Sequence, residues 1–113
     1  MLDSLAEVFR VLGDPTRLEM LGLLRVREIC VCEFVQLFDL SQPSVSQHLR
    51  RLKEAGLVVG RRRGMWVWYR LAEDLPPVVT AALDALPRPL PREGRMRDMD
   101  AQTVCVAASG PSR

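Results

Sequence analysis

Residues 40–60 of this 113-residue chain read LSQPSVSQHLRRLKEAGLVVG, and they predict a helix followed directly by a strand. Ser41 is a candidate N-cap, Pro43 is tolerated in the first helical turn, and Gly56 is placed to end the helix. One face of this helix is apolar and includes the histidine: Val45, His48, Leu49 and Leu52. We expect that face to pack on a core, with His48 as a partly buried packing residue.

The opposite face of the same helix carries short polar side chains and amides, flanked by arginine. Gln and Arg can each form paired hydrogen bonds with purine edges in the major groove of DNA. The pattern therefore predicts a recognition helix. Its expected DNA contacts are Gln42, Ser44, Ser46, Gln47 and Arg51.

The charges are sorted along the chain. Between Ser41 and Arg70 there are seven Lys or Arg residues and one Glu, a local balance of +6 in a chain whose net charge is +2. The rest of the chain therefore sums to −4. A basic block within one third of a small domain is the electrostatic pattern of a protein that binds the phosphate backbone.

Two segments rich in Val, Trp and Tyr, residues 57–60 and 65–71, predict a β-hairpin after the recognition helix. Between them, Arg61-Arg62-Arg63-Gly64 is expected to form the turn. Three arginines at a hairpin tip would project positive charge away from the body of the domain. We therefore expect Arg62 and Arg63 to contact DNA phosphates or the minor groove.

Four further helices are predicted from apolar residues at three- and four-residue steps. They span residues 2–12, a stretch that starts at Pro15 after the N-cap Asp14, residues 31–38, and a last stretch from Asp74 to just before Pro87. The first and last have no evident partner within the chain, so we expect a homodimer. The expected dimer contacts are Leu5, Phe9, Val78, Val79 and Leu83.

The composition predicts one domain, residues 1–86, and a mostly disordered tail, residues 87–113, that carries Cys105. Apolar stretches are short and there is no export-signal layout, so a soluble cytoplasmic protein without membrane contact is expected. The three cysteines make a disulfide framework improbable and favour reduced thiols, which can bind soft ions.

Four stretches together resemble the ArsR/SmtB family of repressors in order and spacing. They are residues 12–18, 28–33, 40–49 and 55–58. The resemblance covers Leu2 to about Leu86. It implies a mainly α, homodimeric winged helix-turn-helix fold with a small β-hairpin. It also implies an apo-dimer that holds operator DNA, represses a resistance operon and leaves the DNA when an inducer binds.

Within that resemblance, Cys30-Val31-Cys32 looks like the sensor of arsenic-responsive members. This implies trivalent arsenic or antimony as the inducer, with no permanent cofactor. Side chains two residues apart on an ideal helix point about 200° away from each other. Both sulfurs can therefore bind one ion only if the segment is extended or distorted, so ligation would pull on the entrance of the helix-turn-helix.

The third ligand departs from the commonest family pattern, because Val35 stands where many arsenic sensors have a third cysteine. Either Cys105 supplies a third thiolate, or Cys30 and Cys32 act with water or hydroxide. Two thiolates would also suffice for a monomethylated trivalent arsenical. No cysteine precedes Cys30, which argues against cadmium or lead, and the single histidine, His48, argues against zinc.

Metalloid sensing has two alternatives, a repressor with another signal and an enzyme. A repressor of the same fold could respond to oxidation of its cysteines, or to another soft metal. A thiol-based arsenate reductase needs an anion-binding loop with a nearby arginine, and the residues after Cys32 provide neither. We therefore do not expect an enzyme.

Overall fold

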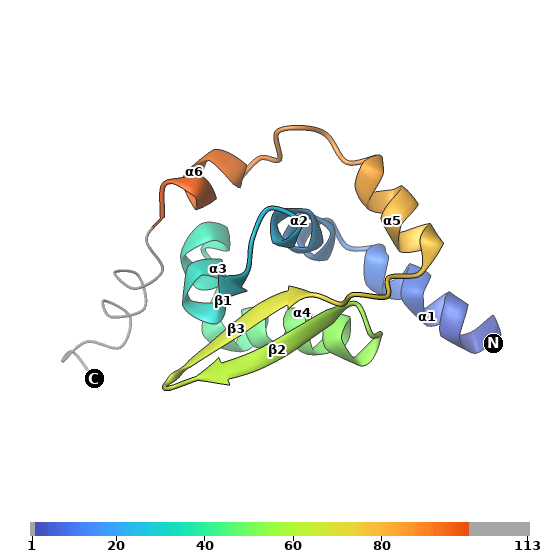
Figure 1. Ribbon diagram of the computed structural model, residues 1–113, viewed down its shortest axis with the longest axis horizontal. Helices are drawn as coiled ribbons and strands as arrows, with labels where there is room; N and C mark the ends of the chain where they lie inside the picture. Colours follow the sequence, from blue (N-terminus) through green and yellow to red (C-terminus); the bar gives the residue numbers. More distant parts are fainter. Residues whose placement is uncertain (1, 100–113) are drawn as a thin grey trace.

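The computed structural model describes residues 2–99, which form six helices and a small antiparallel sheet whose hairpin extends along one edge of the molecule (Figure 1). Cys105 and the rest of residues 100–113 lie outside the described residues. In chain order the elements are α1 (Leu2–Leu12), α2 (Pro15–Leu24), β1 (Ile29–Cys30), α3 (Val31–Phe38), α4 (Gln42–Glu54), β2 (Val58–Arg63), β3 (Trp66–Leu71), α5 (Pro77–Asp84) and α6 (Glu93–Arg97).

Local capping starts α2 and α4 where the sequence predicts them. The Asp14 carboxylate accepts hydrogen bonds from the backbone N–H groups of Thr16 and Arg17, at 2.8 and 3.1 Å, and so caps α2. Ser41 Oγ accepts from Ser44 N at 3.3 Å at the start of α4. Val45, Leu49 and Leu52 are fully buried, which confirms the predicted core face of α4.

The sheet has the strand order β1-β3-β2, and all of its pairs are antiparallel. The sequence analysis missed β1, whose Ile29 and Cys30 pair with Tyr69 and Trp68 of β3. A strand of two residues has too little pattern to be seen without its partner. This strand joins the Cys30 segment directly to the hairpin.

The hairpin differs from prediction at its tip. Arg61, Arg62 and Arg63 lie within β2 and not in the turn, which falls at Gly64 and Met65. Gly64 adopts φ +62°, a conformation that a two-residue hairpin turn requires and that glycine adopts without strain. Since side chains alternate along a strand, the three arginines are divided between the two faces of the hairpin.

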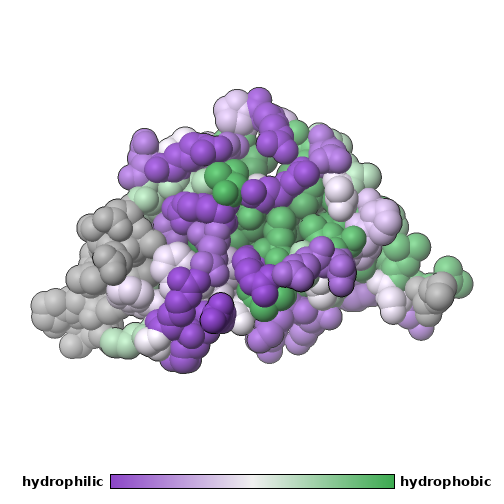
Figure 2. Space-filling model, in the orientation of Figure 1, coloured by the Kyte–Doolittle hydropathy of each residue, from purple (hydrophilic) through white to green (hydrophobic). Residues whose placement is uncertain are grey.

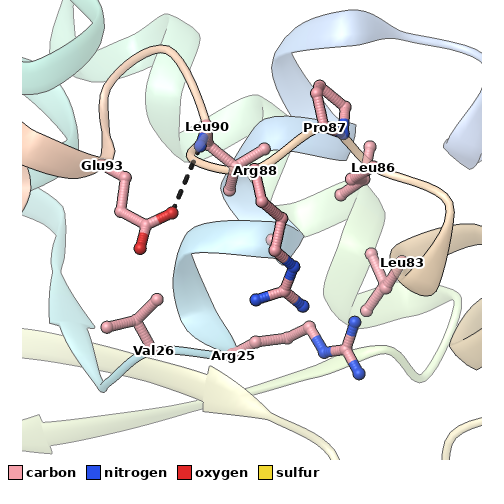
Figure 3. A pocket seen from close by; sticks show the side chains of 9 residues that line it. Arg25, Val26, Leu83, Leu86, Pro87, Arg88, Leu90 and Glu93 are labelled. Carbon is pink, nitrogen blue, oxygen red and sulfur yellow. Dashed lines mark hydrogen bonds between the residues drawn. The ribbon is translucent and has the colours of Figure 1, made fainter.

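Residues 87–99, here named the C-terminal strap, are ordered against the domain, contrary to the tail expected from Pro87 onward. Leu90 and Met96 are buried, and α6 packs against α3. Figure 3 shows the start of the strap crossing α2 beside Arg25 and Val26. A Cβ on Gly22 of α2 would lie 2.7 Å from Leu90 Cδ1, so this glycine permits the close approach.

The helix before the strap, α5, is shorter than predicted because it begins at Pro77 rather than Asp74. Proline is acceptable only in the first turn of a helix, so the Pro76-Pro77 pair marks its start. Val79 and Leu83 of α5 are buried in the core of their own chain, and α5 contacts α2.

Candidate nucleic-acid interface and thiol site

α3 and α4 form a helix-turn-helix, with α3 packed on α4. Asp39 ends α3 in the left-handed conformation, with φ 53°. Leu40 and the N-cap Ser41 then lead into α4. This connection is short enough to set the angle between the two helices, and it leaves one face of α4 exposed.

The exposed face of α4 carries four of the predicted DNA contacts, Gln42, Ser46, Gln47 and Arg51, while Ser44 is half-buried. Ser44, Gln47 and Arg51 line a shallow depression together with His48 and Arg17. The structure thus brings together three of the five α4 residues predicted to meet DNA, and it adds Arg17 of α2, which the sequence analysis missed.

Arg17 joins α1, α2 and α4. Its Nε donates to Val11 O at 2.7 Å, near the end of α1, and its Nη1 lies 3.3 Å from His48 Nδ1 on α4. Arginine can only donate, so the imidazole accepts at Nδ1. His48 is half-buried, as expected for a packing residue, and Arg17 orients its imidazole within the depression.

The hairpin arginines are not equivalent. Arg63 forms an ion pair with Glu28, and its guanidinium carbon lies 4.9 Å from the centroid of the Trp68 ring. Arg62 is exposed and pairs in the ladder with Val67. Among the interactions of residues 2–99 it takes part in no ion pair. In Figure 2, hydrophilic side chains lie along the hairpin next to its tip, and the tip itself is white to pale green.

The two cysteines of the predicted sensor lie where β1 meets α3. Cys30 is fully buried, has the extended backbone conformation φ −90°, ψ 162°, and is the N-cap residue of α3. Cys32 lies in the first turn of that helix and is half-buried. The two residues therefore do not share one regular helix, which relaxes the opposed orientation expected of a continuous helix.

A capping box surrounds Cys30. Its backbone N–H donates to Glu33 Oε1 at 3.1 Å, and the Glu33 N–H interacts in return with the Cys30 side chain. Glu33 is fully buried and receives Arg27 Nη1 at 3.1 Å and Nη2 at 2.7 Å. Neither Glu33 nor Arg27 was singled out from the sequence, although a Glu three residues after an N-cap is a recognisable capping signal.

A second network fastens the strap to the underlying helices. Arg92 Nη1 and N donate to the two carboxylate oxygens of Glu19 in α2, at 2.6 and 2.7 Å. Arg92 Nε donates to Leu37 O at 3.0 Å, and its guanidinium carbon lies 4.5 Å from the centroid of the Phe38 ring. Arg27 Nη2 adds a contact to Met96 O at 3.1 Å.

Within residues 2–99 no three His, Cys, Asp or Glu residues cluster in a way that could hold a metal ion. Cys30 and Cys32 are the only predicted thiol ligands inside this range, because Cys105 lies outside it. None of the helices described is long and apolar enough to cross a membrane.

Residues 14–59, which include α2, the thiol segment and the whole helix-turn-helix, match the family described as bacterial regulatory protein, arsR family. The chain is 40% identical to the arsenical resistance operon repressor of Escherichia coli over 79 residues, covering 69% of this chain and 68% of that protein. The chain belongs to the ArsR family. Members of this family are DNA-binding transcriptional regulators and not enzymes.

Two further similarities support the ArsR-family assignment. The chain is 48% identical over 77 residues to the arsenic resistance transcriptional regulator ArsR1 of Pseudomonas putida, covering 67% of this chain and 60% of that protein. It also superimposes on the homodimeric winged helix-turn-helix DNA-binding domain Mb0332 of Mycobacterium bovis with a TM-score of 0.63. That pair shares 31% identity, over 74% of each chain. The predicted winged helix-turn-helix fold is thereby confirmed.

In this ArsR-family chain the predicted dimer residues fall into two groups. Leu5 and Phe9 of α1 are 45% and 54% exposed, and Val78 of α5 is half-buried. Val79 and Leu83 face the core instead, so their side chains are not available at the surface. Apolar surface is also visible at the N-terminal end of α1 in Figure 2, where Leu2 is 83% exposed.

Proposed function

We propose that the chain is a homodimeric cytoplasmic repressor of an arsenic resistance operon. Trivalent arsenic or antimony, bound by the thiolates of Cys30 and Cys32, releases it from operator DNA. The observation that carries this proposal is the position of Cys30, which is at once the last residue of β1 and the N-cap of α3. The names of the relatives in Escherichia coli and Pseudomonas putida support arsenic as the signal.

The position of Cys30 provides a route from inducer to DNA. Ligation of one ion by both thiolates draws Cys32 and the first turn of α3 toward the end of β1. Since α3 packs on α4, movement of this turn shifts the recognition helix. Since Cys30 pairs with Trp68, the same movement reaches the hairpin. Inducer and DNA then antagonise each other reciprocally, with a coupling of about 1–3 kcal/mol.

For DNA binding, the proposal assigns base contacts to the exposed face of α4 and phosphate contacts to the hairpin. The assigned residues are Gln42, Ser44, Ser46, Gln47, Arg51, Arg62 and Arg63. A twofold dimer would place two recognition helices about 34 Å apart on a palindromic operator. The dimer itself rests on the exposed apolar side chains of α1, together with the half-buried Val78 of α5.

Cys105 is proposed as the third thiolate. α6 packs against α3, and the described chain ends at Met99, six positions before Cys105 in sequence. Six residues of extended chain span at most about 20 Å, so Cys105 lies within about 20 Å of Met99. Trivalent arsenic prefers three thiolates, and thiolate-rich sites favour soft ions generally.

The test is release of a fluorescent operator by arsenite, antimonite, methylarsenite, cadmium, zinc and peroxide, measured by anisotropy. Cys30→Ser and Cys32→Ser should each bind operator like the wild type and resist release by arsenite. Loss of operator binding in the untreated variants would assign the two cysteines a structural role. Release by peroxide but not by arsenite would replace metalloid sensing by thiol oxidation.

Cys105→Ser completes the series as a matched removal of one thiol outside the Cys30–Cys32 segment. Weakened release by arsenite with intact release by methylarsenite is the result expected for a three-thiolate site. An unchanged arsenite response would show that Cys30 and Cys32 suffice.

A further inference from the structure

Three side chains connect the thiol segment to the hairpin. Arg63 Nη2 donates to Glu28 Oε1, and the Arg63 guanidinium lies against the Trp68 ring at 4.9 Å. Glu28 is two residues before Cys30, whose backbone pairs with Trp68. The ion pair, the ring contact and the strand pairing therefore connect the thiol segment to the hairpin through one continuous set of contacts.

The strand register explains why these groups meet. Arg63 is opposite Trp66, so Trp68 is its diagonal neighbour on the same face of the hairpin. Following Trp68 across to β1 leads to Cys30, and Glu28 precedes it by two residues. The Arg63 side chain therefore extends back along the sheet toward the body of the domain, away from the turn at Gly64.

We propose that the Glu28 carboxylate binds the Arg63 guanidinium and competes with a DNA phosphate for it. This competition limits the affinity of the repressor for DNA. The inference rests on the DNA-binding function proposed above. It separates the hairpin arginines into Arg62, which is available to DNA at once, and Arg63, which must first leave Glu28.

Because the Arg63–Glu28 pair is partly exposed, a DNA phosphate can replace Glu28 as the partner of Arg63. The side chains of Arg63 and Glu28 are 47% and 31% exposed, and ion pairs in such positions are weak. A phosphate offers the same charge-assisted acceptor, and its neutralisation also releases condensed counterions. Because Glu28 stands next to β1, the proposal also gives inducer binding at Cys30 a way to change how firmly Arg63 is held.

The experiment compares Glu28→Gln with the control Glu73→Gln. Glu73 is exposed, and its replacement changes the net charge by the same amount. Operator affinity is measured over a series of salt concentrations. Glu28→Gln should bind about 2- to 5-fold more tightly than Glu73→Gln, the range that a partly exposed ion pair supports. Its log–log salt slope should steepen by at most about 0.9, the value of one phosphate contact, because Arg63 then no longer divides its time between Glu28 and that phosphate.

A cycle with Arg63→Ala tests whether the effect passes through Arg63. In the Arg63→Ala background, Glu28→Gln should no longer change affinity or slope. Equal behaviour of Glu28→Gln and Glu73→Gln, or an undiminished gain in the Arg63→Ala background, would overturn the inference while the wild type still binds its operator. Failure of the wild type to bind any operator would instead overturn the proposed function, and this inference with it.

Discussion

Glu33, whose side chain is fully buried, receives both terminal nitrogens of Arg27, at 3.1 and 2.7 Å. The same carboxylate accepts from Cys30 N, and Arg27 also donates to Met96 O. One ion pair therefore connects the thiol segment, the start of α3 and the strap. The hydrogen bond to Glu33 raises the pKa of Arg27, so the guanidinium stays charged at every accessible pH.

Replacement of Arg27 should lower the free energy of unfolding strongly, because it leaves the buried carboxylate of Glu33 without its ion-pair partner. Removing one partner of a buried ion pair typically costs about 3–5 kcal/mol, and we expect Arg27→Met to fall near the lower end because Arg27 is itself partly exposed. Urea unfolding measures the loss. Arg25→Met is the matched control, since its partner Asp84 is exposed and the change should cost under about 1 kcal/mol. Equal losses in the two variants would contradict the assignment.

Arg62 and Gln47 should affect DNA binding in different ways. Arg62→Ala should weaken binding to all sequences alike and flatten the salt slope by about 0.9, the contribution of one phosphate. Gln47→Ala should relax preference at particular base pairs, by about 1–3 kcal/mol, with the salt slope retained. Competition assays with single-base operator variants, repeated at several salt concentrations, measure both quantities. If the two variants behave alike, the division into base and phosphate contacts is wrong.

Phe9 should be central to self-association. It is 54% exposed in the single chain, so covering the exposed half contributes about 1–1.5 kcal/mol per protomer, half the value for a fully exposed side chain. Phe9→Asp should give a folded monomer in sedimentation analysis, with weakened operator binding. Met65→Asp is the matched control, because Met65 is 75% exposed at the hairpin turn and should leave the dimer intact. A dimeric Phe9→Asp variant would place the interface elsewhere.

The strap should loosen in acid through Glu93. Hydrogen bonds from Arg97 and from Leu90 N hold the pKa of Glu93 below its usual value, and Figure 3 shows the bond to Leu90. A carboxylate whose pKa is lowered by folding stabilises the fold at pH values above its pKa in the unfolded chain, about 4.3. This stabilisation is lost as the pH falls through the pKa in the folded protein.

Glu93→Gln should therefore lower the stability near neutral pH and remove this part of the acid sensitivity. Urea unfolding across the acid range, with Glu73→Gln as the control for loss of one exposed carboxylate, measures the difference. Parallel pH profiles for wild type and Glu93→Gln would exclude the contribution.

The starts of α2 and α4, and the core face of α4, were predictable because their causes are local. The Asp14 cap acts on Thr16 and Arg17, two and three residues away. Likewise, the apolar face of α4 follows from a spacing that repeats within one helix. The presence of a hairpin was equally visible from its alternating aromatic residues, although the position of its turn was not.

Long-range contacts decided the rest. β1 exists only because Cys30 meets Trp68, and the strap is ordered because Arg92 reaches Glu19, 73 residues away in sequence. A proline-rich segment with two buried apolar side chains, Leu90 and Met96, has no periodicity that predicts order. The order of this segment depends on the surface formed by the neighbouring helices. It also depends on buried carboxylates such as Glu19, whose hydrogen-bond partners come near only when the chain folds. Strand pairing likewise determines which hairpin arginine is held by Glu28, because strand register is a property of the assembled sheet.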